Sequence, residues 1–346
     1  MSICVFRLDA AGTPCFSIRK AVKCLCNRAS PERIRKKAAN WTADRNAMTR
    51  RISPAIFFLS LWLPGAVGLE AARAEDLPPS PAELRALVAR VIANQHRDDA
   101  ALEEYERTEH RQARQHDKDT AFIEDKTFRV IPAGTGTAHI QIEERGRPVD
   151  SALYRKQLQN VEQALVLVLN PSSRQRQDAE KYAKRARDRR DVVDAVGNAF
   201  LYTWLGRETR NGRTLAKLRL EPNPAFKPTA RNTNLFANVR ATAWVDETAG
   251  RVVRIEAEIF RDIYFGGGLL GKVYQGGRFA LEQAEVAPGV WLPTLYDYNF
   301  AGRKFFFGVE VHERTEVSRY HRIGPPSEAL GAIRRELGSR LAHSNP

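Results

Sequence analysis

Short runs of alternating apolar and polar residues recur between residues 199 and 323, about every 10 to 15 positions. Turn signals such as Asn211-Gly212, Glu247–Gly250 and Ala301-Gly302 separate them. No helical pattern lies between the runs, so neighbouring strands are expected to pair antiparallel through hairpins. The predicted strands are Ala199–Glu208, Thr214–Glu221, Val239–Asp246, Arg251–Phe260, Arg278–Val286, Trp291–Phe300 and Lys304–Val317.

The alternation divides the predicted sheet into an apolar face and a polar face. In one strand Val253 and Ile255 share a face with Ala257, whereas Arg254 and Glu256 point the other way. A long one-sided sheet curves through its own twist, and its apolar face needs a cover. The expected fold class is therefore α+β, a curved antiparallel β-sheet covered by amphipathic helices.

Two amphipathic helices are available as that cover. Ser80-Pro81-Ala82-Glu83 is a capping box with proline at the first helical position, and apolar residues from Leu84 to Ile92 follow at helical spacing. This pattern predicts a helix over about residues 81–95. A second helix is predicted from Asp150-Ser151 to Asn170-Pro171, with its apolar residues on one face.

Other segments give weaker signals. Residues 100–118 fit either a continued helix or a strand, whereas 126–131 and 138–143 alternate like the two strands of a hairpin. Residues 174–190 carry eight basic residues interleaved with three acidic ones. We interpret the Arg174–Arg190 segment as a solvated helix with ion pairs, and a surface for anionic lipid headgroups is the alternative.

The N-terminal region has the pattern of a leader. Arg50-Arg51, an apolar run over Ala55–Leu63 and Ala72-Arg73-Ala74 follow the order of a cleavable signal peptide over residues 48–74. The apolar run is too short for a permanent membrane span. We therefore expect cleavage after Ala74 and a periplasmic location.

Residues 1–47 are then a mis-assigned start, with true initiation at Met48, or a discarded leader. The four cysteines Cys4, Cys15, Cys24 and Cys26 all lie there, so the mature chain is expected to have no disulfide and no thiol chemistry.

The mature chain is expected to form a single domain over residues 75–326. It contains an inserted helical segment over residues 150–190. A C-terminal tail over residues 327–346 follows, with a short helix-like segment.

Charge and motifs narrow the function. The chain carries a net charge of +14, but residues 1–74 hold +9 of it, which removes the main support for nucleic-acid binding. The segment Gly266–Lys272 resembles a phosphate-binding loop, yet Val273 replaces the required Ser or Thr, so no nucleotide is expected. No residue is assigned a catalytic, cofactor-binding or metal-binding role, and the chain is not expected to be an enzyme.

Aromatic and aliphatic side chains in the β region are the remaining functional signal. They form either an ordinary core or an apolar cavity between a half-open sheet and its helical cover. The glycine loop 265–272 has an apolar tip and would suit a lid over such a cavity. The ligand-cavity candidates are Trp204, Leu218, Val239, Ala241, Val253, Ile255, Phe265, Leu269, Leu270, Phe279, Trp291, Phe305 and Phe307.

Part of the chain resembles the LolA/LolB-like superfamily of periplasmic outer-membrane lipoprotein-sorting proteins. The resemblance lies in Ala243–Asp246, a turn and Arg251–Glu256, followed by Phe265–Gly271 and Gly289–Pro293. It implies an incomplete antiparallel β-barrel with helices inside its concave face, an apolar interior for acyl chains, no cofactor and no bond chemistry. The chain departs from the family in its greater length and its basic segment 174–190, and no position matches the carrier's functional arginine.

The function expected from these observations is binding of lipid acyl chains or lipoproteins in an apolar half-barrel cavity. A periplasmic protein-interaction or envelope-stress-sensing relative is the first alternative. The second alternative is an envelope hydrolase, which a cluster of perturbed carboxylates or histidines in a cleft would favour.

Overall fold

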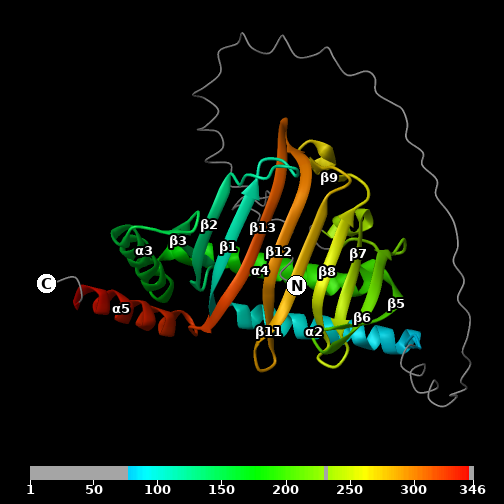
Figure 1. Cartoon of the computed structure of the whole chain (residues 1–346), viewed down its shortest axis with the longest axis horizontal. Helices are drawn as coiled ribbons and strands as arrows, with labels where there is room; N and C mark the ends of the chain where they lie inside the picture. Colours follow the sequence, from blue (N-terminus) through cyan, green and yellow to red (C-terminus); the bar gives the residue numbers. More distant parts are fainter. Residues whose placement is uncertain (1–76, 230–232, 343–346) are drawn as a thin grey trace, which may run out of the picture. The chain divides into compact units, whose positions relative to one another are not determined.

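The computed structural model describes residues 77–229 and 233–342. The expectations for the signal peptide 48–74, the start at Met48 and the cysteines concern residues outside this described part. Figure 1 shows the described chain as one broad sheet with helices packed against it.

The strands of the described residues belong to one antiparallel sheet in the order β4-β3-β2-β1-β13-β12-β11-β8-β7-β6-β5, with β10 paired to β12 and to β9. The sheet is open, because β4 and β5 end it on either side. The strands are β1 Tyr105–Arg114, β2 Glu124–Pro132, β3 Thr137–Glu144, β4 Arg147–Pro148, β5 Phe200–Arg210, β6 Arg213–Pro222, β7 Val239–Asp246, β8 Arg251–Ile259, β9 Ile263–Phe265, β10 Gly271–Val273, β11 Arg278–Ala287, β12 Val290–Lys304 and β13 Phe307–Arg322.

The predicted antiparallel sheet is confirmed, and so are the turns at Asn211-Gly212 and Glu247–Gly250. The turn expected at Ala301-Gly302 is wrong, because both residues are paired within β12 and the chain turns at Phe305-Phe306 instead. Asn211 and Gly212 both have positive φ, at 52° and 73°, as the two-residue turn between β5 and β6 requires. The ambiguous segment 100–118 contains β1, which pairs with β2 on one side and with β13 on the other. Pairing with a strand some 200 residues later in the chain therefore decides between the two local possibilities.

The helices are α2 Pro81–Leu102, α3 Ser151–Leu169, α4 Ser173–Ala199 and α5 Pro326–Ala342, with short 3-10 turns η1 at Thr233–Asn238 and η2 at Gly266–Gly268. The capping box is present: the backbone N–H of Glu83 donates to Ser80 Oγ at 3.3 Å, and the backbone N–H of Ser80 donates to Glu83 Oε2 at 2.7 Å. No helix in the described part of the chain combines the length and the apolar composition that crossing a membrane would need.

The helices α3 and α5 pack together over β2 and β3, beside one end of the sheet in Figure 1. Leu158 and Leu165 of α3 and Ile333 of α5 are fully buried against Ile131 and Ile140 of the two strands. The expected C-terminal tail is thus corrected, because α5 is part of the core. The inserted helical region also extends past residue 190, to the end of α4 at Ala199.

The helices α2 and α4 cover the other end of the sheet, over β5 to β8. Leu87 of α2 and Val193 of α4 are buried on the same side as Leu218 of β6 and Ile255 of β8. Two separate helix pairs therefore cover the sheet, and each pair has its own apolar core.

Candidate apolar ligand site

A small apolar cavity of about 50 Å³ lies between α2, α4 and the strands β5 to β8. All but two of the residues that line it are aliphatic. The lining consists of Leu87, Val88, Val91, Ile92, Gln95, Val193, Val196, Tyr202, Leu218, Leu220, Ala243, Val245, Val252 and Ile255. Such a volume holds a few water-sized groups, so a long acyl chain requires a helix to move outward.

A strip of partly exposed apolar residues continues from this cavity across the same face of the sheet. Leu220, which lines the cavity, lies directly opposite Ala241, and Ala241 lies opposite Ala257. Ala257 lies opposite Phe279, and Phe279 lies opposite Tyr298. Directly opposed residues on antiparallel strands share a face, so these side chains form a continuous row.

The apolar strip is defined here as Val239, Ala241, Ala257, Ile259, Phe279 and Tyr298. All six are half-buried, unlike the buried side chains around the cavity. Phe279 and Tyr298 have ring centroids 5.1 Å apart, which gives the strip an aromatic end on β11 and β12. The site therefore has a closed end under the helices and an open end on the sheet.

Polar contacts fix α2 over the sheet. Asn94 Nδ2 donates to the backbone oxygen of Gly250 at 2.9 Å, and Asp98 pairs with Arg251 of β8 at 2.6 Å. Asp98 also accepts a hydrogen bond from the backbone N–H of Trp291 at 3.2 Å. Burial raises the pKa of Asp98, and this bond and Arg251 oppose the rise. These directional bonds set the position of α2 along the sheet.

The helix α4 is held mainly near its C-terminal end. Val192, Val193 and Val196 are buried, whereas the residues before them are exposed or half-buried. The Tyr182 hydroxyl donates to the Glu103 carboxylate at 2.6 Å, and burial together with this bond raises the pKa of Tyr182 to about 12. The N-terminal two-thirds of α4 therefore has few apolar contacts that oppose an outward movement.

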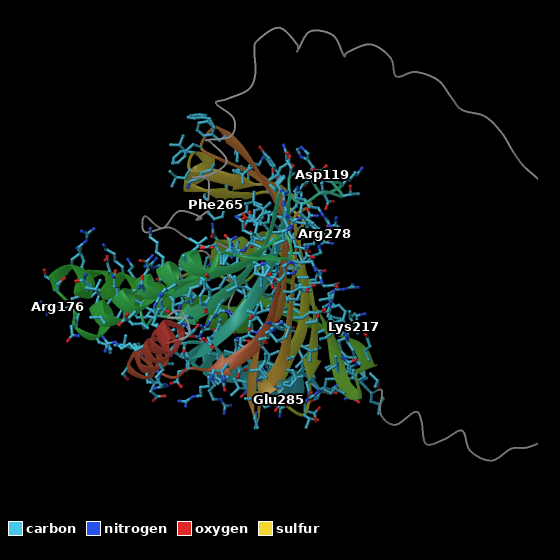
Figure 2. The ribbon with its side chains drawn as sticks, turned by 60° about the vertical axis from the view of Figure 1, so that its left-hand side comes forward. Asp119, Arg176, Lys217, Phe265, Arg278 and Glu285 are labelled. Atoms are coloured by element: carbon cyan, nitrogen blue, oxygen red, sulfur yellow. The ribbon has the colours of Figure 1, made fainter. Side chains whose placement is uncertain are left out.

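The basic segment 174–190 forms the exposed N-terminal part of α4. Lys181 pairs with Asp178 at 3.2 Å, and Arg189 lies 3.8 Å from Glu103. Figure 2 shows Arg176 well away from the sheet, at the outer end of this helix. The helical expectation is confirmed, and lipid headgroups as a partner remain a prediction.

A buried charged cluster lies on β1. Glu109 pairs with Arg107 at 2.8 Å, and its carboxylate lies 3.5 Å from His139 and 3.7 Å from Arg111. Burial alone would raise the pKa of Glu109, but His139, Arg107 and Arg111 outweigh it and lower the pKa to about 2. A carboxylate with such a low pKa is a weak base near neutral pH.

A larger polar pocket of about 510 Å³ lies between α3 and strands β1 and β2. Arg129 in its wall bonds Glu106 at 2.7 Å, Glu336 of α5 at 2.6 Å and the Tyr154 hydroxyl of α3 at 2.9 Å. These bonds join both helices to the sheet, so we interpret this arginine as a structural link.

The structure separates the predicted cavity residues into groups. Leu218 and Ile255 line the cavity, and Val239, Ala241 and Phe279 belong to the strip.

The remaining sheet residues of that prediction lie as follows. Val252 takes the lining position expected for Val253, because the pairing of β7 with β8 shifts between Trp244 and Val245. Trp204 lies opposite Leu218 with Arg207 over its ring, and Trp291 is buried under Arg213.

Five predicted residues lie elsewhere, at the far end of β12 and the loop beside it. They are Phe265, Leu269, Leu270, Phe305 and Phe307. None belongs to the cavity lining, and Leu269 is 69% exposed, so the structure does not place the loop 265–272 as a lid over this cavity.

Several lining residues were missed in the sequence, although a signal for them exists. The apolar stripe of the first helix, with Leu87, Val88 and Val91, identifies the side of α2 that meets the sheet. Val193 and Val196 sit within a helix of mostly charged residues, and only the packing of α4 onto the sheet shows their role. Among the described residues, no group of three or more His, Cys, Asp or Glu is arranged to hold a metal ion.

No protein-family model matches the chain, and no curated protein matches it. Five chains of known structure do match it, among them the following two. A DUF1329 family protein from Desulfovibrio piger is 10% identical with a TM-score of 0.25, over 69% of this chain and 93% of that chain. An outer membrane lipoprotein-sorting protein domain from Vibrio parahaemolyticus is 11% identical with a TM-score of 0.27, over 71% and 99%.

Proposed function

We propose that this protein binds the acyl chain of a lipid or lipoprotein in the periplasm, without bond chemistry. The observation that carries the proposal is the continuous apolar surface from the cavity under α2 and α4 to the half-exposed strip ending at Tyr298. The strip runs from β7 to β12, about 14 Å at the usual spacing between strands. An acyl chain lying along it would bury methylene groups, each worth about 0.8 kcal/mol.

The helix α4 supplies the adaptable part of this site. Its buried residues are confined to the region from Val192 to Ala199, whereas α2 is fixed by Asn94 and Asp98. In the proposed mechanism α4 swings outward, the 50 Å³ cavity widens, and the end of the acyl chain enters it. Closing of α4 would help to expel the chain, which a carrier that releases its cargo needs.

The buried carboxylates favour binding over hydrolysis. The pKa of Glu109, lowered to about 2, is far from that of a general base. The carboxylate of Asp98 is occupied by Arg251 and the Trp291 N–H. Both groups therefore support a structural role within a binding protein.

The test is native mass spectrometry with lipid extraction on protein purified without detergent. We expect a co-purifying acyl lipid of defined mass, and substantially less of it in Ala241→Phe, which fills the strip. Thr242→Phe is the matched control, since it changes the next residue of β7, on the opposite face.

A protein that stays lipid-free, even after incubation with lipid vesicles, would contradict the proposal. That result would favour the protein-interaction alternative. Equal lipid content in both variants would place the lipid somewhere other than the strip.

A further inference from the structure

Large apolar side chains gather at one end of the sheet, on two adjacent loops. We define the apolar tip as Leu269, Leu270, Phe305, Phe306 and Phe307. Phe306 is 85% exposed, Phe307 is 75% exposed and Leu269 is 69% exposed. Scattered single apolar residues are normal on protein surfaces, but a contiguous group of this kind marks an interaction site.

Two backbone features hold these side chains together. The strand β10 pairs with the end of β12, where Gly271 lies opposite Lys304. The backbone N–H of Phe305 also donates to the oxygen of Leu270 at 3.2 Å. Figure 2 places Phe265, which precedes the first loop, at the end of the sheet opposite Glu285. The tip is thus an ordered projection.

The backbone at the tip has an unusual conformation. Gly266, Gly267 and Gly268 all have positive φ, which lets the chain turn tightly just before Leu269. Phe305 also has positive φ, at 53°, a conformation that is unfavourable for a bulky side chain. Strain of this kind is commonly retained at functional positions.

Basic residues flank the tip in the sequence. Residues 261–274 and 303–308 contain four basic residues and one acidic residue, Asp262. Asp262 pairs with Lys272 at 2.6 Å. The two segments together carry a net charge of +3. Protruding phenylalanine and leucine side chains that are flanked by Arg and Lys match the boundary between the acyl chains and anionic headgroups of a bilayer.

We propose that the apolar tip inserts into the surface of a bilayer that contains anionic lipids. The apolar side chains enter the region between headgroups and acyl chains, and the surrounding cations contact the headgroups. The net positive charge favours a bilayer over a second copy of the chain, because two such tips would repel each other. This inference does not depend on acyl-chain binding at the strip.

The test is vesicle flotation of the protein purified without detergent, using phosphatidylcholine vesicles with or without about one quarter phosphatidylglycerol. We expect binding to the anionic vesicles and at least about tenfold weaker partitioning for the variant F305S/F306S/F307S. High salt should weaken binding of the unchanged protein several-fold. All variants are prepared with the same N-terminus, so any contribution of that segment is common to them.

The matched control is L153S/L167S, which removes two exposed leucines of α3, 47% and 48% exposed. Its binding should equal that of the unchanged protein. Equal binding of the tip variant, or equal loss in the control, would overturn the proposal. Sedimentation without vesicles tests whether the tip instead binds a second copy of the chain. A dimer that is lost in the tip variant would assign the tip to self-association and overturn the proposal.

A second measurement detects insertion itself. In Phe306→Trp the new indole should be quenched by brominated lipid in anionic vesicles. The native tryptophans are present in both the variant and the unchanged protein. The quenching of the unchanged protein is therefore the reference, and the variant should be quenched more strongly. Equal quenching in the two proteins would show that residue 306 stays in water and would contradict the proposal.

Discussion

The helix pair α3 and α5 closes its part of the sheet, whereas the pair α2 and α4 leaves a cavity over its own. The first pair buries Leu158, Leu165 and Ile333 completely against β2 and β3. The second pair surrounds about 50 Å³ of apolar space and adjoins a half-exposed strip. The same sheet therefore supports a part built for stability and a part with room for a ligand.

The largest expected effect compares two buried leucines. Leu165 in the closed part is fully buried and Leu218 at the cavity is 2% exposed. Leu165→Ala should lower the free energy of unfolding by about 4–5 kcal/mol, and Leu218→Ala by about 2–3 kcal/mol, because α4 can settle into the enlarged space. Urea denaturation measures both. A loss at Leu218 that equals or exceeds that at Leu165 would show that both parts are packed equally rigidly.

The second prediction concerns β1, between the two helix-covered parts. Because the pKa of Glu109 is lowered to about 2, its contribution to stability is present above about pH 4.5 and disappears as the pH falls toward 2. Glu109→Gln should lower the free energy of unfolding at pH 7 by on the order of 3 kcal/mol. The difference from the unchanged protein should shrink steadily on acidification.

Urea denaturation between pH 7 and pH 3 measures this effect. Glu310→Gln is the control, since Glu310 is an exposed carboxylate paired with His116, and it should show no measurable difference at pH 7. A Glu109→Gln difference that stays constant with pH would mean that the loss comes from packing and not from the charge.

The sequence predicted much of the covered sheet, because those signals are local. Ser80 and Glu83 fix the start of α2 through bonds three residues apart, and β7 has the predicted bounds Val239–Asp246. The strand β1 could not be recognised in this way. Its buried Glu109 is satisfied by Arg107, Arg111 and His139, the last of which lies on another strand.

The candidate site was predictable only in part, for the same reason. The alternation in β8 identifies the apolar face, but the shift in pairing beside Val245 exchanges Val253 for Val252 at the cavity. The apolar residues of α5 are visible in the sequence, but its packing against α3 is not, because the two helices lie far apart in the chain. The local sequence pattern therefore shows which face of a strand or helix is apolar, whereas the pairing of distant segments decides which residues reach the cavity.

The third prediction adds volume in each part. Ala243 borders the cavity, and Ala329 of α5 is fully buried in the closed core. Ala329→Val should destabilise the protein by about 1–3 kcal/mol through overpacking. Ala243→Val should stabilise it by about 0.5–1 kcal/mol, because its methyl groups enter existing space. Thermal unfolding measures both, and destabilisation by Ala243→Val would argue against usable space at the cavity.

The smallest expected effect tests whether α4 is the movable helix. Tyr182→Phe removes the hydrogen bond to Glu103 and should lower the free energy of unfolding by only about 1 kcal/mol. Amide hydrogen exchange should nevertheless become faster across residues 173–190, because this bond helps to hold the part of α4 that lacks buried contacts. Tyr154→Phe is the control, since it removes a bond from α3 to Glu336 where buried leucines hold the helix. If exchange rises equally in α3 and α4, both helix pairs are held alike, and the acyl chain must enter by a route other than the outward movement of α4.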